Sequence, residues 1–531
     1  MTIQPTMLRP PPTRPGWQVA VGLVLTLPAL VLLLTSYVEP LYWTVSSSFR
    51  KFSGLRMTEG GEGVGWDNYD AAYAQGRLAD AHWFALSLAI VPILLVVLLA
   101  PAIAWAAHAG GTWARWVTRI ALALPIAAFA PVAIAVGLRE SPTRSAYWLG
   151  TFGLVVALAA TAYLAALRRR TLDSTRSPVP AALVVGGLAV LAVVAVALQD
   201  FTFAFIGGFG SRADLTPARL MYETSFRTMS FGAGAAISVT LLLPLILLGL
   251  AATLLVILPG TRLEVDPKLP SASKGQPVVA WVVGGVLLLA TLGGIWSGLG
   301  PWLSDITETG RPGAPSTWVN TWLPPVISTL VGVTVAALAA FGISGLRPFG
   351  RHSEWLLLPF GLFLFVGSAP LALRNFAAGV TADRLDSFIG LIPPSRVAIP
   401  ALFVLALLFR GQAQRREVLL QEGHRAPWTG VVLPALPMLA LAYVATWLVQ
   451  AQDLIWPLIT AAGDHPTAQN QLVQTLLLRA RTADQSLPYA QLLPLWLLLL
   501  LVAVVIAAQL LYLDRLALRV GLPERDHPPR T

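Results

Sequence analysis

The amino-acid sequence predicts an all-α polytopic membrane protein with about twelve transmembrane helices in two pseudo-symmetric halves of six. Of the 531 residues, 56% are hydrophobic and only 12% are charged, a composition far from that of soluble globular domains. Twelve apolar runs approach the roughly 20 residues that a helix needs to cross a bilayer. The runs are 17–38, 83–107, 120–137, 146–166, 180–198, 231–258, 278–295, 323–343, 355–373, 397–409, 429–449 and 490–512.

The charged residues orient the chain, because all of them lie outside these runs. If both termini are cytoplasmic, Lys and Arg are about twice as dense in the inner segments as in the outer ones. We therefore expect a multi-pass protein of the cytoplasmic (inner) membrane with both termini in the cytoplasm. The net charge of +10 then reflects topology and anionic lipid headgroups, so the lipid bilayer is an expected partner and nucleic acid is not.

The first half begins with a Pro-rich tail, residues 1–16, and its first span lacks a small-residue cleavage site. We expect an uncleaved anchor there. Spans two to four contain several prolines, which mark kinks in membrane helices. The loop after span four, 167–179, is short, and Pro178 and Pro180 would end any helix begun at Arg170.

An internal repeat joins the two halves. Gln199-Asp200 follows span five and Gln452-Asp453 follows span eleven, each with an aromatic residue close behind and one more span after it. This indicates a repeat of roughly 260 residues whose copies share one orientation, because six spans return the chain to the inside. The predicted domains are a first half at 1–258, a cytoplasmic linker at 259–277 and a second half at 278–531.

The spans of the second half follow the same pattern, with one irregularity. The tenth run, 397–409, is short for a membrane helix. Residues 388–392 could extend it across Pro393-Pro394. The eleventh run follows a basic polar loop that begins near Arg415.

Three stretches carry motifs. Residues 64–69 read VGWDNY, residues 417–424 read EVLLQEGH with VLP at 432–434, and residues 452–458 read QDLIWPL after Trp447. In maltose-type ABC importers, the first permease subunit carries V-G-L-D-N-Y, which the first stretch resembles. The second stretch resembles the coupling loop E-A-A-x-x-D-G-A followed by I-x-L-P. The third resembles W-N-D-F-x-W-P-L of the second permease subunit. The chain thus looks like the two permease subunits fused end to end.

The resemblance implies a carbohydrate-type importer component. ATP would be used by separate ABC ATPase subunits, with no cofactor in this chain, and an extracytoplasmic solute-binding protein would deliver the solute. The residues that it places in the ATPase-coupling loop are Glu417, Val418, Leu419, Glu422, Gly423 and Pro434.

The coupling loops depart from the family pattern, and this keeps a second hypothesis open. Val418 and Leu419 replace two alanines, whose small size permits close helix packing, and the loop 167–179 is too short for a second docking helix. The alternative is a transport-inactive permease derivative that serves as a membrane scaffold or assembly subunit of another complex.

Polar and aromatic residues at span ends are candidates for a substrate path, because amides and carboxylates hydrogen-bond sugar hydroxyls while aromatic faces cover the ring. The alternative is that the tryptophans form an interface belt and the Gln-Asp pairs cap helices. The candidates are Gln199, Asp200, Phe203, Tyr443, Trp447, Gln450, Gln452, Asp453 and Trp456.

Several chemistries are not expected. The sequence has no G-x-x-x-x-G-K-[S/T] loop to bind ATP phosphates, no cysteine, and no pair of histidines at metal-ligand spacing. Proton- or sodium-coupled carriers usually place ionisable residues within their spans, and the predicted spans contain none. A membrane enzyme could use Asp67 and Asp70 on the first outer loop, but Asn68 and Tyr69 between them belong to the VGWDNY motif, so we expect neither an enzyme nor a metal site.

Overall fold

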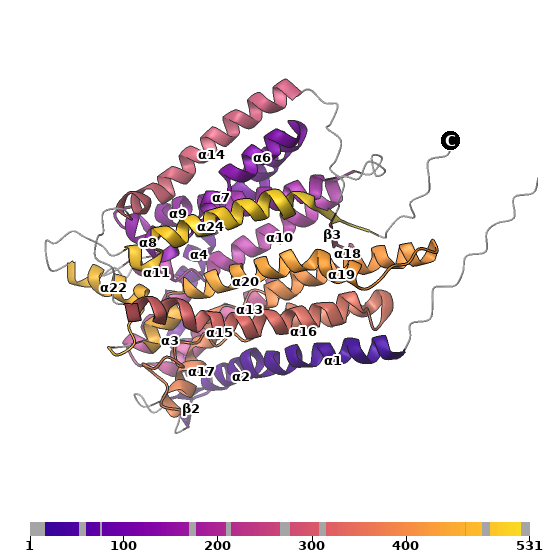
Figure 1. The fold of residues 1–531 in the computed structure, drawn as a ribbon. Helices are drawn as coiled ribbons and strands as arrows, with labels where there is room; N and C mark the ends of the chain where they lie inside the picture. Colours follow the sequence, from indigo (N-terminus) through magenta and orange to yellow (C-terminus); the bar gives the residue numbers. More distant parts are fainter. Residues whose placement is uncertain are drawn as a thin grey trace, which may run out of the picture.

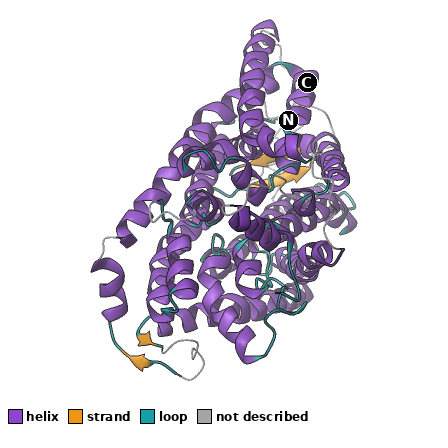
Figure 2. Ribbon diagram, turned by 90° about the vertical axis from the view of Figure 1, so that its left-hand side faces the viewer, coloured by secondary structure: helices purple, strands orange, loops and turns teal. Residues whose placement is uncertain are grey.

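The computed structural model describes residues 16–52, 60–74, 77–168, 177–208, 214–265, 277–306, 315–461, 463–479 and 489–521. The chain forms an elongated bundle whose long helices run roughly side by side (Figure 1). Strands in the described part are limited to two short antiparallel ribbons, orange in Figure 2.

The elements are named in chain order, with η for 3₁₀ and π segments. Up to residue 265 they are α1 (Gly16–Leu33), η1 (Leu34–Val38), α2 (Glu39–Ser47), β1 (Arg50–Lys51), β2 (Glu62–Gly63), α3 (Asp67–Ala74), α4 (Arg77–Leu94), η2 (Leu95–Leu99), α5 (Ala100–Ala109), α6 (Gly111–Ala121), α7 (Ala123–Ala127), α8 (Pro131–Gly137), α9 (Thr143–Leu167), α10 (Val179–Leu198), α11 (Thr202–Gly207), α12 (Pro217–Tyr222), η3 (Glu223–Arg227), α13 (Phe231–Ile257) and β3 (Arg262–Val265).

From residue 277 they are α14 (Pro277–Asp305), α15 (Pro315–Ala340), η4 (Phe341–Gly345), η5 (Gly350–Leu357), α16 (Leu358–Gly361), α17 (Ser368–Thr381), α18 (Ile399–Gln421), α19 (Thr429–Val432), η6 (Leu433–Ala435), α20 (Leu436–Ala451), α21 (Ile455–Thr460), α22 (Ala468–Arg479), α23 (Tyr489–Leu492), α24 (Leu495–Ala507), η7 (Ala508–Tyr512), η8 (Leu513–Arg515) and β4 (Leu516–Arg519).

Within the described residues, nine helices are long and apolar enough to cross a membrane, and the bent group α6–α8 would be a tenth. The nine coincide with predicted spans one, two, four to eight, eleven and twelve. Their outward-facing leucines and valines are exposed, as lipid contact requires. The chain is therefore a multi-pass, all-α membrane protein.

Two predicted spans are interrupted rather than straight. The helix axis bends by 85° between α7 and α8, where Ala130 is extended because Pro131 follows it. Predicted span nine is split between α16 and α17, and Gly367 is extended before α17. Hydropathy alone did not reveal these breaks, because the residues around them are apolar.

The tenth span differs from the prediction at both ends. Residues 382–398 are not helical and α18 begins at Ile399, so the suggested extension across Pro393-Pro394 is wrong. Pro393 and Pro394 remove two backbone donors, but this alone does not decide the outcome, because α15 contains Pro324-Pro325 in its interior. The helix continues instead through the predicted polar loop, from Arg415 to Gln421.

Long-range packing connects the beginning of each predicted half to the other half. Helix α1 packs against α15 and η4, while α14 packs against α5 and α9. Glycines permit both crossings: a Cβ at Gly342 would collide with the Gly22 carbonyl, and one at Gly298 with the Leu149 carbonyl. Each of these two helices therefore lies against the backbone of a distant segment.

The second ribbon joins the start of the predicted linker to the C-terminal segment. Strands β3 and β4 are antiparallel, with Leu263 opposite Leu518 and Glu264 opposite Ala517. β3 packs on α18 and β4 on α9. This ribbon lies at the same end of the bundle as the start of α1 (Figure 1).

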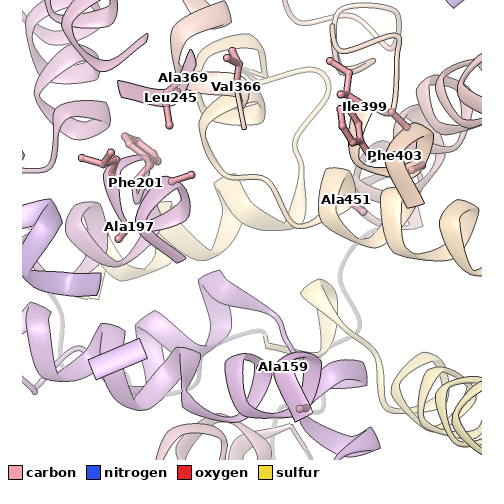
Figure 3. Packing of buried hydrophobic residues seen from close by; sticks show 14 of the residues in the cluster. Ala159, Ala197, Phe201, Leu245, Val366, Ala369, Ile399, Phe403 and Ala451 are labelled. Carbon is pink, nitrogen blue, oxygen red and sulfur yellow. The ribbon is translucent and has the colours of Figure 1, made fainter. Parts of the chain in front are cut away.

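The core between the helices is rich in alanine. Figure 3 shows Ala197 and Phe201 gathered with Leu245, Val366 and Ala369, all of which are buried. Small side chains allow membrane helices to approach closely. The same packing holds the short helices α11 and α17 in fixed positions beside the long ones.

Candidate functional site

The segment predicted to couple to an ATPase is the end of a long helix. Glu417, Val418 and Leu419 lie in the last turns of α18, which is continuous from Ile399 to Gln421. Gly423, at φ +83°, ends the helix in the left-handed conformation that favours glycine. A separate docking helix is not present between Arg415 and Thr429, a range that the structure describes throughout.

Part of this segment is engaged in ion pairs. The Glu417 carboxylate lies 2.9 Å from the Arg347 guanidinium, which also lies 3.7 Å from Glu354. Arg410 in α18 lies 3.2 Å from Glu354. The base of the segment is thus tied to the loop after η4.

The turn after α18 is exposed, whereas residues 428–434, which follow it, contact other parts of the chain. Residues 421–425, including Glu422, are exposed, and Val418 and Leu419 are half-buried. The Arg416 guanidinium stacks 4.0 Å from the Trp428 ring centroid. Pro434 lies in η6, where its carbonyl accepts a 2.7 Å hydrogen bond from the Tyr512 hydroxyl.

The corresponding loop of the first half lies mostly outside the described residues. Helix α9 ends at Leu167, and residues 169–176 are not described. Arg168 is buried.

The two Gln-Asp pairs occupy equivalent places in the fold. Gln199 and Gln452 are 253 residues apart, and so are the ends of α10 and α20 and both ends of α11 and α21. Each Asp starts the short helix that follows it. The Asp200 carboxylate accepts from the backbone N–H groups of Phe203 (3.4 Å) and Ala204 (3.0 Å).

Asp453 caps α21 in the same way. Burial raises the pKa of its carboxyl, while hydrogen bonds from the Ser368 hydroxyl and from the backbone of Ile455 and Trp456 oppose the shift. Both carboxylates thus act as helix caps.

Gln199 fixes the break in span nine. Its amide donates to the Phe365 carbonyl (2.7 Å) and accepts from the Gly367 N–H (2.7 Å). Its equivalent, Gln452, donates only a long 3.5 Å bond to Leu492, and its Oε1 has no partner among the described residues. Phe203 is buried with its ring edge-on to Tyr147.

Two of the candidate residues line one cavity. Gln450 and Trp456 surround a space of about 10 Å³, enough for about one water molecule. Trp447 lies nearby, where its indole donates to the Trp322 carbonyl (3.0 Å). Tyr443 bonds the Thr334 hydroxyl on an exposed face. The structure does not bring Gln199, Asp200 or Phe203 to this cavity.

Sequence reasoning missed the other polar residues of the cavity. Asn320 and Thr321 line it from α15, Thr467 from the loop before α22, and Gln469 from α22. The run Ala468-Gln469-Asn470-Gln471 was an available signal, because three consecutive amides are unusual beside apolar spans. The described residues contain no group of three or more His, Cys, Asp or Glu that could hold a metal ion. We find no match between this chain and a known protein family or a curated protein.

Proposed function

We propose that the chain is the permease component of an ABC-type importer for a carbohydrate or a similar polar solute, powered by separate ATPase subunits. In this proposal twelve spans form two pseudo-symmetric halves, at 1–258 and 278–531, in the cytoplasmic membrane with both termini inside. A solute-binding protein delivers the solute from outside.

The observation that carries this proposal is the reciprocal packing of the two halves. The first helix of each half, α1 or α14, packs on the other half. Helix α13 packs on α16 and α17, and α24 packs on α7. Two permease domains related by an approximate two-fold axis would make contacts in such matching pairs, as a transport path between them requires.

The antiparallel ribbon supports the same arrangement. β3 follows α13 and β4 follows α24, so the two strands come after the sixth span of each half. They pair antiparallel, and each rests on the fourth span of the other half.

A second candidate function is favoured by the coupling segment. Glu417 is already paired with Arg347, and Val418 and Leu419 extend α18 instead of forming a separate docking helix. A permease derivative without transport, acting as a membrane scaffold or assembly subunit, would tolerate these changes.

Co-purification separates the two candidates. The tagged full-length chain, extracted from its native membrane in mild detergent, is expected to bring down an ABC ATPase and a solute-binding protein. Recovery of a different set of membrane partners would support the scaffold instead.

A paired substitution tests the coupling segment itself. Val418→Ala with Leu419→Ala should increase ATPase capture several-fold, because smaller side chains permit closer helix docking. Leu420→Ala, at an exposed neighbour, is the matched control and should have no effect. Unchanged capture in the double variant would count against the permease.

A further inference from the structure

A non-helical segment, residues 391–398, lies beside the middle of a helix that is long enough to cross the membrane. The Ala398 N–H donates to the Gly332 carbonyl (3.2 Å). Gly332 is near the middle of the apolar span that α15 and η4 form, Pro315–Gly345. Leu330, in the same turn of α15, is 54% exposed, as contact with lipid requires. The segment therefore lies at the depth of the hydrocarbon layer.

Three neighbouring elements hold this segment in place. The Ser395 carbonyl accepts from the Ser328 hydroxyl of α15 (3.0 Å), and the Gln450 amide of α20 donates to the Ser395 hydroxyl (3.4 Å). The Val397 carbonyl accepts from the Tyr37 hydroxyl of η1 (3.3 Å). Irregular backbone at membrane depth is tolerated only where protein buries it or where it lines a water-filled cavity.

One residue of the segment, Arg396, carries an exposed charge. Val397 and Ala398 beside it are buried, whereas Arg396 is exposed. Its backbone lies against α15, because a Cβ added at Gly332 would lie 3.5 Å from the Arg396 carbonyl carbon. Among the described residues, Arg396 makes no hydrogen bond and no ion pair.

Water, and not lipid, must surround this guanidinium. Trp318 and Trp496 are exposed and their rings lie 6.0 Å apart, as in an aromatic belt at a membrane interface. Gly332 is about 21 Å from Trp318 along α15, at 1.5 Å per residue. Half of the hydrocarbon layer is roughly 15 Å, so Arg396 lies too far from either surface to place its charge among the headgroups. Charged side chains at such depth are paired or line a water-filled cavity, and the exposure of Arg396 indicates the cavity.

This arrangement is confined to the second half. The fourth span of the first half, α9, is one continuous helix from Thr143 to Leu167. Its counterpart α18 begins only at Ile399 (labelled in Figure 3), after the non-helical segment. The repeated scaffold therefore does not require an arginine at membrane depth.

The guanidinium defines the chemistry of a ligand. It has five N–H donors in a planar fork that matches the two oxygens of a carboxylate or phosphate, and it has no acceptor. Ser395 and Gln450, which adjoin it, are neutral hydrogen-bonding groups. No Asp or Glu among the described residues competes for Arg396.

We propose that a water-filled pocket beside residues 391–398 binds small organic anions, with Arg396 paired to a carboxylate or phosphate group. The pocket follows from the depth and exposure of Arg396. Only the identification of the anion as the transported solute rests on the proposed permease function, which it narrows to solutes that carry a negative charge.

Cysteine labelling tests the pocket, because the native chain has no cysteine. Arg396→Cys, in the full-length chain in lipid nanodiscs, is treated with (2-sulfonatoethyl) methanethiosulfonate, a charged reagent that does not enter hydrocarbon, and modification is followed by intact mass. We expect a rate similar to that of Arg425→Cys in the exposed turn after α18. Leu330→Cys, exposed at the same depth on α15, is the matched control and should react roughly a hundredfold more slowly, because the reactive thiolate does not form in hydrocarbon.

A second variant, Ser395→Cys, keeps the arginine and reports its charge. Its rate with the anionic reagent should exceed its rate with the cationic trimethylammonium analogue by about tenfold, because a positive charge a few Å away attracts the anion and repels the cation. Adding Arg396→Gln should abolish this preference. Inorganic phosphate or succinate should slow the labelling of Ser395→Cys, whereas D-glucose should not.

The outcomes are distinguishable. If Arg396→Cys and Ser395→Cys react no faster than Leu330→Cys, the pocket is overturned. Equal rates with both reagents, or labelling that neither phosphate nor succinate slows, would overturn anion binding. ATPase capture without anion binding would leave the permease proposal standing, whereas anion binding without ATPase capture would support the pocket and count against that proposal.

Discussion

Gln199 and Gln452 each lie between a long helix and a short one at the same spacing, yet they make different hydrogen bonds. Gln199 bonds the Phe365 carbonyl and the Gly367 N–H, both half-buried, at the break between α16 and α17, 166 and 168 residues away in sequence. Gln452 makes one long hydrogen bond. The sequence predicted the two pairs as equivalents, but it could not predict the partners of Gln199, because the break in span nine has no hydropathy signal.

Replacing Gln199 should therefore destabilise the protein more than replacing Gln452. Gln199→Leu leaves the Phe365 carbonyl and the Gly367 N–H unpaired, which should lower the free energy of unfolding by about 2 kcal/mol. Gln452→Leu is the control and should cost less than about 1 kcal/mol, since it removes an unpaired oxygen. Thermal unfolding of both variants in detergent measures the difference, and equal effects would contradict the assigned role of Gln199.

Asp453 should make stability depend on pH. Burial raises its pKa in the folded state above the ordinary value of about 3.9, so the folded protein binds the proton more tightly than the unfolded chain. The free energy of unfolding contributed by this group should then fall as the pH rises from about 4 to the folded-state pKa, and stay constant above it.

Asn at this position provides the comparison. Asp453→Asn cannot titrate, so its thermal unfolding temperature should show a weaker decline over the same pH interval. An identical pH profile in the wild type and the variant would show that Asp453 does not contribute.

At the scale of elements, hydropathy predicted long helices well and their ends poorly. The run 397–409 predicted a short span, whereas α18 continues to Gln421 because nothing between Arg410 and Gln421 breaks a helix. The ribbon was not predicted, since four-residue strands at Arg262–Val265 and Leu516–Arg519 carry little pattern and depend on pairing across the whole chain.

The ribbon can be tested by cross-linking, because the native chain has no cysteine. Leu263→Cys with Leu518→Cys places two thiols directly opposite each other, at a separation that disulfides accept. We expect nearly complete intrachain cross-linking in membranes, seen as a mobility shift on denaturing gels that a reductant reverses.

A neighbouring pair provides the control for register. Leu263→Cys with Ala517→Cys puts the second thiol on the opposite face of β4, so its yield should be at least about fivefold lower. Similar yields for the two pairs would contradict the register.

At the scale of the whole molecule, charge and hydropathy predicted a multi-pass helical protein, and the structure agrees. They could not predict which helices meet, because every span is apolar and packing is decided by small residues such as Gly22, Gly298 and Gly342. The order of the spans along the chain does not indicate that α1 packs on α15 or that α14 packs on α5 and α9.

This packing predicts that the chain can be divided without losing its assembly. When residues 1–270 and 271–531 are co-expressed as separate chains, a tag on one should recover the other, because α1 packs on α15 and η4 while α14 packs on α5 and α9. Either fragment alone should aggregate in detergent, since each exposes the surface that the other covers.

Gly298→Leu in the second fragment should reduce recovery about tenfold, because its side chain would collide with the Leu149 carbonyl of the first. Gly285→Leu, on the same helix but facing open space, should leave recovery unchanged. Two fragments that are each monodisperse alone and do not associate would contradict the packing of α1 and α14 on the opposite fragment. They would also contradict the two-fold arrangement on which the permease proposal depends.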